Sequence, residues 1–275
     1  MTDRYALFGN PLGHSKSPLI HNGFAKSLGH DVEYSLIEAP LGGFAPAALA
    51  WRDSGAKGCN ITTPFKIDAH DLATERLPRA EQAGAANCLK FEPDGRILAE
   101  MFDGIGLAND IERNLGISMK GRRVLMLGAG GTVRGSLQPF LACEPATLVV
   151  ANRTADKAQA LARQFAAYGP VSGCGYGDLG SERFDIVLNA TSASLRGELP
   201  AVPASAFVGA ALAYELAYGK GLTPFLRLAQ SAGASRLADG VGMLVEQAAE
   251  SFLLWRGVRP DTAPVLAELR RQIDG

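Results

Sequence analysis

A short apolar run, followed at once by a glycine-rich turn and a helical stretch, constrains this chain more than any other feature. Residues 123–127 are typical of a buried strand, Gly128-Ala-Gly-Gly131 follows directly, and a helical pattern extends to Ala142. A second strand is predicted over 147–151. Glycines at such a turn let backbone N–H groups at a helix start approach a pyrophosphate. The order strand, loop, helix, strand favours a nucleotide-binding unit over a plain turn, although Val133 replaces the third glycine of G-x-G-x-x-G.

The rest of the chain alternates strand-like runs with helical patterns, which is typical of an α/β protein with mostly parallel sheets. We predict two domains, an N-terminal α/β substrate domain (1–104) and a Rossmann-type doubly wound domain (105–238). The C-terminal helices, in residues 239–275, are expected to return to the substrate domain. Strands are predicted at 5–8, 32–37, 58–61, 185–189 and 210–214, and helices at 18–28 with Ser17 as N-cap, 44–54, 243–255 and 263–273.

Charge and hydropathy exclude several classes of function. The 275 residues carry 27 Lys and Arg against 28 Asp and Glu, so no basic field is available to hold a nucleic acid. No apolar run approaches the roughly 18 residues needed to cross a bilayer, and the first residues lack the layout of a signal peptide. We therefore expect a cytoplasmic protein that binds a small molecule and has neither a membrane nor a nucleic-acid partner. The oligomeric state is not readable from the sequence.

Cysteines and histidines give no sign of a disulfide framework or a metal site. The four cysteines are widely spaced without a C-x-x-C pair, and the four histidines lack the spacing of metal ligands. We predict no bound metal, and reduced, buried thiols. The residues are Cys59, Cys88, Cys143 and Cys174, and His14, His21, His30 and His70.

The end of the strand after the glycine loop indicates the type of cofactor. NAD-binding domains commonly place Asp or Glu about 20 residues past the loop, where it binds the ribose 2′-hydroxyl. Here the strand ends at Asn152-Arg153-Thr154, so Arg153 and Lys157 can flank a 2′-phosphate, and Thr154 can cap the next helix. This pattern favours NADP. The alternative is that both cations are solvated and Asp156 meets the ribose.

Three other loops are rich in hydroxyl and amide side chains. Such groups at strand ends suit a polyhydroxylated substrate bound through many neutral hydrogen bonds. Taken singly, each fits a turn or a cap equally well, and composition alone does not join the three loops. The residues are Ser15 and Ser17 at a helix start, Asn60, Thr62 and Lys66 in and beyond a strand end, and Asn87 farther along.

Several longer motifs resemble the shikimate dehydrogenase family. The run G-N-P-x-x-H-S-x-S-P-x-x-H-N at 9–22 and the run N-x-T-x-P-F-K at 60–66 are the most specific. The resemblance covers nearly the whole chain in the family order. The other matching stretches are G-A-x-N at 84–87, G-A-G-G-x-x-R-G at 128–135, N-R-T at 152–154, N-A-T-S at 189–192, Tyr214 followed by K-G-L-T-P-F at 220–225, and D-G-V-G-M-L-V-E-Q at 239–247.

The resemblance implies an oxidoreductase that interconverts shikimate and 3-dehydroshikimate with NADP, in aromatic amino-acid biosynthesis. It implies that Lys66 and Asp103 form the catalytic pair, and that Ser15 and Ser17 bind the substrate carboxylate. The further substrate contacts that it implies are Asn60, Thr62, Asn87, Tyr214 and Gln247. With the glycine loop and the strand end, it implies cofactor contacts at Gly128, Ala129, Gly130, Gly131, Asn152, Arg153, Thr154, Lys157, Thr191, Gly240 and Met243.

The chemistry of these residue types fits the oxidation of an alcohol, which needs a hydride acceptor and a group that takes the hydroxyl proton. Lys66 can carry that proton, while Asp103 orients the ammonium and accepts a hydrogen bond from the reacting hydroxyl. Met243 and Gln247 are four residues apart, hence on one face of the predicted final helix. The plain structural alternatives are an exposed helix-start lysine at 66 and a core methionine at 243.

The chain departs from the family pattern just before the nucleotide-binding domain. The family usually has Asn and Thr there, and this chain has Met101 and Phe102. If these apolar side chains face the substrate, polar contacts are lost, and we expect slower turnover of shikimate or a changed substrate. Smaller departures are Cys88 and Glu215, where Thr and Asp are more usual.

Two other functions stay open at this point. The first is a paralogous dehydrogenase that acts on quinate or an amino-substituted shikimate, with NADP or NAD. The second is an NADP-binding sensor that has lost catalysis, against which the retained Lys66 and Asp103 argue.

Overall fold

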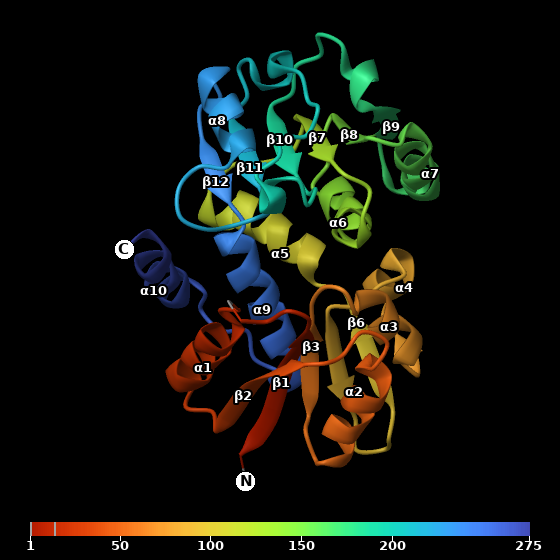
Figure 1. The fold of residues 1–275 in the computed structure, drawn as a ribbon, viewed down its shortest axis with the longest axis vertical. Helices are drawn as coiled ribbons and strands as arrows, with labels where there is room; N and C mark the ends of the chain where they lie inside the picture. Colours follow the sequence, from red (N-terminus) through yellow and green to blue (C-terminus); the bar gives the residue numbers. More distant parts are fainter. Residues whose placement is uncertain (1, 14) are drawn as a thin grey trace. The chain divides into compact units, whose positions relative to one another are not determined.

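The computed structural model describes residues 2–13 and 15–275, which form two compact units (Figure 1). The first unit comprises Met1–Gly106 with Val245–Gln272, and the second comprises Leu107–Leu244 with Ile273–Gly275. These divisions differ from the predicted ones because two helices, α5 (Asp103–Asn109) and α9 (Val241–Arg256), run through them without a break. The last part of α9 and most of α10 (Ala263–Asp274) belong to the first unit.

A mixed sheet forms the centre of the first unit. Its strands are β1 (Asp3–Gly9), β2 (Val32–Glu38), β3 (Gly58–Ile61), β4 (Glu75–Arg76), β5 (Cys88–Phe91) and β6 (Ile97–Glu100). The helices of this unit, besides those above, are α1 (Ser17–Leu28), α2 (Phe44–Asp53), α3 (Lys66–Leu72) and α4 (Pro78–Ala83). The strand order is β2-β1-β3-β5-β6-β4. β1 pairs in parallel with β2 and β3, as the alternation of strands and helices predicts, whereas β5 runs antiparallel to β3 and β6.

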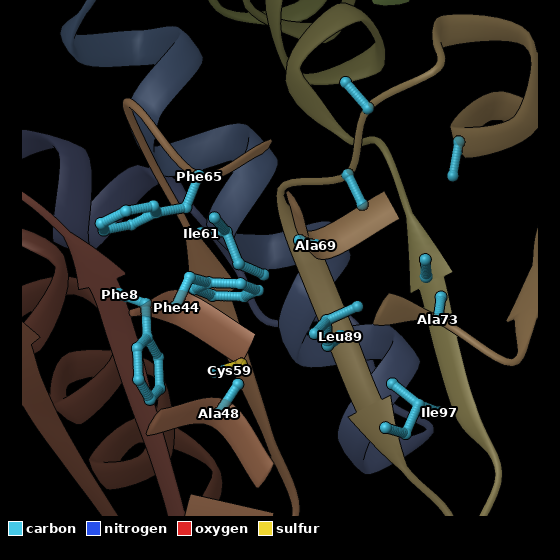
Figure 2. Packing of buried hydrophobic residues seen from close by; sticks show 14 of the residues in the cluster. Phe8, Phe44, Ala48, Cys59, Ile61, Phe65, Ala69, Ala73, Leu89 and Ile97 are labelled. Carbon is cyan, nitrogen blue, oxygen red and sulfur yellow. The ribbon is translucent and has the colours of Figure 1, made fainter. Parts of the chain in front are cut away.

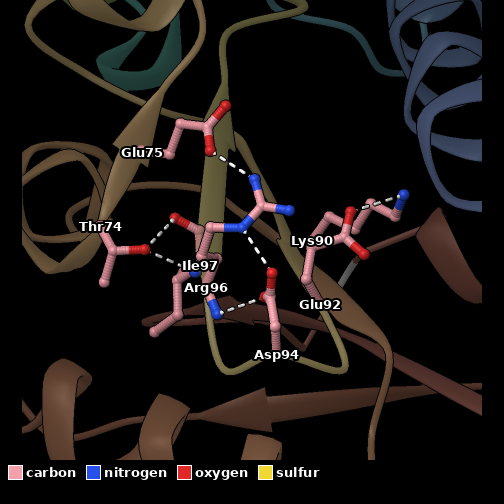
Figure 3. Close-up of polar contacts among 7 residues, drawn as sticks. All are labelled: Thr74, Glu75, Lys90, Glu92, Asp94, Arg96 and Ile97. Atoms are coloured by element: carbon pink, nitrogen blue, oxygen red, sulfur yellow. Dashed lines mark hydrogen bonds and ion pairs between the residues drawn. The ribbon is translucent and has the colours of Figure 1, made fainter.

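A tight turn between β5 and β6 explains the antiparallel pairing. Gly95 has a φ of +90°, a conformation that favours glycine, and its N–H donates to the Glu92 carbonyl over 3.0 Å. Arg96 follows the turn and contacts the carboxylates of Glu75 and Asp94 at 2.7 and 2.8 Å (Figure 3). Because so short a connection has no room for a crossover helix, the two strands must run in opposite directions.

The first unit has a core on each face of its sheet. On one face Phe8 of β1 packs edge-on against Phe44 of α2, with ring centroids 5.7 Å apart, among side chains from α2, α3 and α4 (Figure 2). On the other face Tyr5 of β1 stacks on Trp255 of α9 at 4.4 Å. Side chains at odd positions of β1 therefore pack in one core and those at even positions in the other. A shift by one residue would exchange the two sets, so this packing fixes the register of the strand and of the loop that follows it.

The second unit contains a fully parallel sheet. Its strands are β7 (Arg123–Leu127), β8 (Thr147–Asn152), β9 (Val171–Gly175), β10 (Ile186–Asn189), β11 (Leu212–Glu215) and β12 (Leu237–Asp239). The helices are α6 (Gly131–Ala142), α7 (Ala155–Phe165) and α8 (Pro224–Ser231), with short helical turns at η1 (Asp110–Asn114), η2 (Ala166–Tyr168), η3 (Tyr176–Leu179), η4 (Ser194–Arg196) and η5 (Ala204–Phe207). The strand order β12-β11-β10-β7-β8-β9 is that of a Rossmann fold, so the predicted doubly wound class is confirmed.

The order of this sheet also locates its ligand-binding edge. The chain winds outward from β7 to β9 on one side and from β10 to β12 on the other, so the direction of winding reverses between β7 and β10. In open α/β sheets, ligands bind beyond the carboxyl ends of the strands at such a point. The glycine loop follows β7 directly and therefore lies at this edge.

The thiols are only partly as predicted. Cys59 and Cys88 are buried, and burial raises the pKa of the Cys59 thiol well above its usual value. Cys143 and Cys174 are partly exposed, because Cys143 ends α6 and Cys174 lies on the edge strand β9. In the part of the chain that the structure describes, no helix is long and apolar enough to cross a membrane. Nor do the described residues include a group of three or more His, Cys, Asp or Glu that could hold a metal ion, and His14 lies outside them.

Candidate active site

An ion pair between Lys66 and Asp103 is the centre of a polar cluster in the first unit. Each residue begins its helix, Lys66 in α3 and Asp103 in α5. The Lys66 Nζ lies 2.5 Å from the Asp103 Oδ2, and the two side chains are 20% and 7% exposed. A charge-assisted hydrogen bond of this kind is short and strong, so the ammonium is held in one place while it keeps some access to solvent.

Asn87 connects this pair to the final long helix. Its Nδ2 donates to the Asp103 Oδ1 over 2.7 Å and to the Gln247 Oε1 over 3.0 Å. Its Oδ1 accepts the backbone N–H of Phe102 over 2.8 Å. Gly106 allows α9 to come this close, because a Cβ at that position would lie 2.7 Å from the Gln247 Cβ. Asn87 therefore fixes the orientation of the Asp103 carboxylate.

The two serines of the N-terminal loop lie together at the start of α1. The Ser15 hydroxyl donates to the Ser17 Oγ over 3.3 Å, and the Ser17 N–H donates to the Ser15 Oγ at the same distance. The helix N-cap is Lys16, so the prediction that Ser17 caps the helix is wrong. Because Ser17 is not the cap, its hydroxyl is not committed to the backbone of α1, and it can serve a ligand.

Close packing brings this N-terminal loop against the loop after β3. A Cβ at Gly9 would lie 2.4 Å from the Thr62 Cγ2, so any larger residue there would have to displace the Thr62 side chain. The Thr62 N–H donates to the Phe8 carbonyl over 2.9 Å, and the Asn10 N–H donates to the Thr63 carbonyl over 3.2 Å. The structure thus joins two of the three polar loops that composition alone did not connect.

Asn60 is placed differently from the other predicted substrate residues. Its side chain is buried, with 4% of the residue exposed. Its Nδ2 donates to the Asn87 carbonyl over 3.2 Å and to the Ser251 Oγ over 2.8 Å. Both of its N–H donors are therefore used inside the unit, and only Oδ1 has a lone pair left for a substrate.

The glycine loop of the second unit has the geometry of an anion site. Gly128 has a φ of +114°, and a Cβ there would meet the Ala190 carbonyl oxygen at 3.1 Å. Gly130 is the N-cap of α6 in an ordinary extended conformation, and a Cβ there would touch no described atom within 4 Å. The protein itself therefore does not require glycine at 130. The open space above the helix start fits a pyrophosphate bound by backbone N–H groups.

The end of β8 carries exposed cations, as predicted. Arg153 and Lys157 are both exposed, and within 2–13 and 15–275 no hydrogen bond or ion pair holds either side chain. Thr154 is the N-cap of α7, although its hydroxyl makes no capping bond, and Asn152 donates to the Thr154 carbonyl over 3.0 Å. Asp156 lies in the first turn of α7, so the alternative ribose contact is still sterically available.

The remaining cofactor candidates follow β10 and β12. The hydroxyl and the N–H of Thr191 both donate to the Asn189 Oδ1, over 2.7 and 3.1 Å. Gly240 precedes α9, and a Cβ there would lie 2.0 Å from the Leu216 carbonyl oxygen. Met243 packs, partly buried, against the core that includes α6. All the predicted cofactor residues belong to the second unit, and the predicted substrate residues, except Tyr214, belong to the first.

Comparisons with known proteins identify the family. Family models match residues 7–89 (shikimate dehydrogenase substrate binding domain), 109–196 (shikimate / quinate 5-dehydrogenase) and 240–270 (shikimate 5′-dehydrogenase C-terminal domain). The chain is 55% identical over 273 residues to shikimate dehydrogenase (NADP⁺) of Nitrosospira multiformis, covering 99% of each chain, and 53% identical over 276 residues to that of Aromatoleum aromaticum, again covering 99% of each. The chain belongs to the shikimate dehydrogenase family. The predicted family, enzyme class and NADP dependence are confirmed.

Solved structures of this family support the fold over its full length. An Ael1 enzyme from Pseudomonas putida has 56% identity and a TM-score of 0.93, covering 100% of this chain and 99% of its own. Shikimate 5-dehydrogenase from Thermus thermophilus, solved with NADP(H) and shikimate, has 30% identity and a TM-score of 0.87, covering 98% of this chain and 99% of its own.

The prediction that Tyr214 binds the substrate is wrong. Tyr214 is fully buried on β11, with 0% of its surface exposed. Its hydroxyl donates to the Asp110 Oδ2 over 2.7 Å and accepts the Met243 N–H over 3.3 Å. Burial, reinforced by the Asp110 carboxylate, raises the pKa of Tyr214 well above 10. Tyr214 is therefore a core residue that ties β11 to η1 and α9.

Tyr218 is a more exposed tyrosine on the same segment, and the sequence patterns did not single it out. It follows β11 by three residues, at the carboxyl edge of the sheet, and is 38% exposed. Partial burial raises the pKa of its hydroxyl, so Tyr218 stays a hydrogen-bond donor at neutral pH. The sequence does contain one indication that Tyr218 lies outside the core, because it comes after the apolar run that ends at Tyr214.

The unusual residues Met101 and Phe102 both pack in the core of the first unit. Met101 is 0% exposed among alanines of α4 and the loop after it, and Phe102 is 4% exposed in the core that contains Trp255. The Arg79 guanidinium lies over the Phe102 ring, 5.3 Å from its centroid. The hypothesis that these side chains face the substrate is therefore wrong, and the physical reason given for slower turnover of shikimate no longer holds. The departure at Glu215 is also internal, since this buried carboxylate accepts hydrogen bonds from side chains after β10 and before α8.

Proposed function

We propose that this chain interconverts shikimate and 3-dehydroshikimate, with NADP as the hydride carrier, in aromatic amino-acid biosynthesis in the cytoplasm. The observation that carries the proposal is the Lys66–Asp103 pair, locked by Asn87 at the helix starts of the first unit. It occurs in a chain that is 55% identical to a shikimate dehydrogenase (NADP⁺) along its whole length. The four free cysteines agree with a reducing compartment.

In this proposal, Lys66 and Asp103 handle the proton of the hydroxyl that is oxidised. The Lys66 ammonium is the proton donor in the reducing direction, and the neutral amine accepts the proton in the oxidising direction. Asp103 keeps the Nζ in place through its Oδ2, and Asn87 prevents the carboxylate from rotating. Bound NADP⁺ supplies the acceptor for the hydride.

The other polar groups of the first unit are proposed to bind the substrate. Ser15 and Ser17 receive the carboxylate at the start of α1, where two hydroxyls and the positive end of the helix favour an anion. Thr62, Asn87 and Gln247 contact the ring hydroxyls, and Asn60 contributes through its Oδ1. From the second unit we propose Tyr218, in place of Tyr214, as a further hydroxyl donor to the substrate.

The second unit is proposed to hold NADP in three places. The loop at Gly128, Ala129, Gly130 and Gly131 binds the pyrophosphate. The strand end at Asn152, Arg153, Thr154 and Lys157 binds the 2′-phosphate, since its two cations have no competing partner among the described side chains. Thr191, Gly240 and Met243 line the nicotinamide end.

Steady-state kinetics on the purified chain test the proposal. Shikimate and quinate are each offered with NADP⁺ and with NAD⁺, and NADPH or NADH formation is followed by absorbance. We expect the highest kcat/KM for shikimate with NADP⁺. A higher kcat/KM for quinate would assign the chain to the quinate branch of the family, and binding of both ligands without turnover would identify a sensor.

A further inference from the structure

The hydroxyl of Tyr34 lies beneath the polar loops of the first unit. Tyr34 is on β2, is 6% exposed and donates a hydrogen bond to the Asn60 Oδ1 over 2.8 Å. Asn60 is on β3, so this contact passes over the intervening strand β1. One buried hydroxyl therefore holds the amide of a residue that we propose as a substrate contact.

The hydrogen bond from Tyr34 determines which way the Asn60 amide points. The O–H of Tyr34 is the donor of this contact, and it needs an acceptor on Asn60. Oδ1 must then face β2, and Nδ2 must face the Asn87 carbonyl and the Ser251 hydroxyl. Without the tyrosine O–H the amide can turn over, and Asn87 loses the support of the Nδ2.

The ring of Tyr34 is itself held rigidly. The His21 imidazole stacks on it in parallel, with centroids 4.2 Å apart and planes 5° apart. Burial lowers the pKa of His21 to about 3, so the imidazole is neutral and places no charge beside the ring. Burial also raises the pKa of Tyr34 well above 10, so its hydroxyl keeps its proton at the pH values where the enzyme is assayed.

We infer that Tyr34 is a positioning residue for substrate binding, acting through Asn60 and, by way of the Asn60 Nδ2, through Asn87. The inference rests on the proposed function, because it takes the roles of these two residues from it. Tyr34 does not contact the reacting atoms. It sets the orientation of groups that do, in the same way that supporting hydrogen bonds hold the residues of other catalytic sites.

Substitution of Tyr34 by Phe removes only the hydroxyl and keeps the stacked ring. We expect KM for shikimate to rise about five- to fifty-fold, the range for one unsatisfied buried hydrogen-bonding group. We expect kcat to fall by no more than about threefold, since two intervening residues, Asn60 and Asn87, separate Tyr34 from the catalytic pair. KM for NADP⁺, measured at saturating shikimate, should not change.

Tyr5→Phe is the matched control. Tyr5 lies in the same core cluster and is 2% exposed, but its ring stacks on Trp255, and among the described residues no hydrogen bond joins its hydroxyl to a proposed substrate residue. It should lose stability in thermal unfolding to an extent similar to that of Tyr34→Phe, and keep the KM for shikimate of the unaltered chain. Equal effects of the two substitutions on KM would show that Tyr34 is merely a core residue and would overturn the inference.

A double-substitution cycle with Asn60→Ala covers the case in which Tyr34→Phe folds poorly. If Tyr34 acts through Asn60, removing its hydroxyl should raise KM for shikimate clearly less in an Asn60→Ala background than in the unaltered chain. Additive effects on KM would contradict the inference. If the unaltered chain neither turns over nor binds shikimate, the proposed function and this inference both fail. If it turns over shikimate and Tyr34→Phe matches it, only the inference fails.

Discussion

At the scale of single residues, Lys66 is the most direct test of the catalytic assignment. Lys66→Ala removes a group that acts in proton transfer, so kcat should fall by about 10²–10⁴-fold while KM for shikimate changes little. Lys90→Ala is a matched control, because Lys90 also lies in the first unit, is 29% exposed and pairs with Glu92 at 2.8 Å (Figure 3). A Lys66→Ala enzyme that keeps most of its kcat would rule out the proposed role.

The two tyrosines near the end of β11 should behave in opposite ways. Tyr218→Phe should raise KM for shikimate about five- to tenfold, the loss of one hydrogen bond, with unchanged stability. Tyr214→Phe should leave KM unchanged and lower the free energy of unfolding by about 1–3 kcal/mol, because Asp110 loses a buried partner. Urea unfolding and steady-state kinetics on both variants check this. The reverse pattern would restore Tyr214 as the substrate contact.

These residues show where sequence reasoning is strong and where it is weak. Lys66 and Asp103 are 37 residues apart in the sequence, and only the resemblance to a known family predicts that they form a pair. The structure places the Lys66 Nζ 2.5 Å from the Asp103 Oδ2, so the two side chains are in contact. Tyr214 illustrates the weakness. Whether a strand-end tyrosine points into the core or toward a ligand depends on which face packs against α5 and α6, and no local pattern records that choice.

At the scale of elements, the junction of β8 and α7 determines the choice of cofactor. Arg153→Ala should weaken NADP⁺ about 10- to 150-fold and leave NAD⁺ almost unaffected, because only NADP⁺ has the phosphate that a guanidinium can bind. Arg163→Ala, near the other end of the same helix, is the control and should change neither KM. Equal losses for NADP⁺ and NAD⁺ would mean that Arg153 acts on the fold and not on the phosphate.

The stretch between β6 and α5 gives a second test at this scale. Because Met101 and Phe102 are core residues, Met101→Asn with Phe102→Thr should bring no gain in kcat/KM for shikimate. Loss of the Phe102 ring alone should lower the free energy of unfolding by about 3–5 kcal/mol. The buried amide introduced at position 101 should lower it further. Thermal unfolding and kinetics on one preparation measure both effects. A gain in kcat/KM would mean that one of these side chains reaches the substrate after all.

Elements with local signals were predicted well, and those that depend on a partner strand were missed. β3 and β7 begin and end at the predicted residues, because each is a short run followed directly by a turn or a glycine loop. β4, β5, β6, β9 and β12 were not predicted. β4 has two residues and β12 three, β9 contains two glycines, and all three lie at sheet edges where pairing with a neighbour defines the strand. β5 and β6 are four-residue strands inside the sheet that pair with each other across a tight turn.

At the scale of the whole molecule, the order of domains and the parallel Rossmann sheet were predictable, and the exact divisions were not. Gly104 and Asp239-Gly240 resemble linkers in the sequence, yet α5 and α9 continue through the divisions. Gly104 lies inside α5, where the residues after it continue the helix despite its low helix propensity, whereas Gly240 directly precedes α9.

The stability of the whole molecule should fall in mild acid because of one buried histidine. His21 is fully enclosed by Tyr34, Phe24 and Trp255, and burial lowers its pKa from 6.5 to about 3. The unfolded chain takes up a proton below pH 6.5 that the folded chain refuses, so this contribution to stability is complete above pH 6.5 and is lost as the pH falls toward 3. Glu100 and Glu215 act in the opposite direction, since burial raises the pKa of both carboxyls.

His21→Phe isolates the histidine from these opposing carboxyls. The substitution keeps an aromatic ring against Tyr34 and removes a ring nitrogen, Nε2, that has no hydrogen-bond partner among the described residues. Between pH 6.5 and 5 the unaltered chain should lose about 2 kcal/mol of unfolding free energy relative to the variant, at roughly 1.4 kcal/mol per pH unit for one proton. Urea unfolding of both proteins at pH 7, 6 and 5 measures the difference. Parallel pH profiles would mean that His21 takes up a proton as readily in the folded chain as in the unfolded chain. Any acid sensitivity would then have to come from other groups.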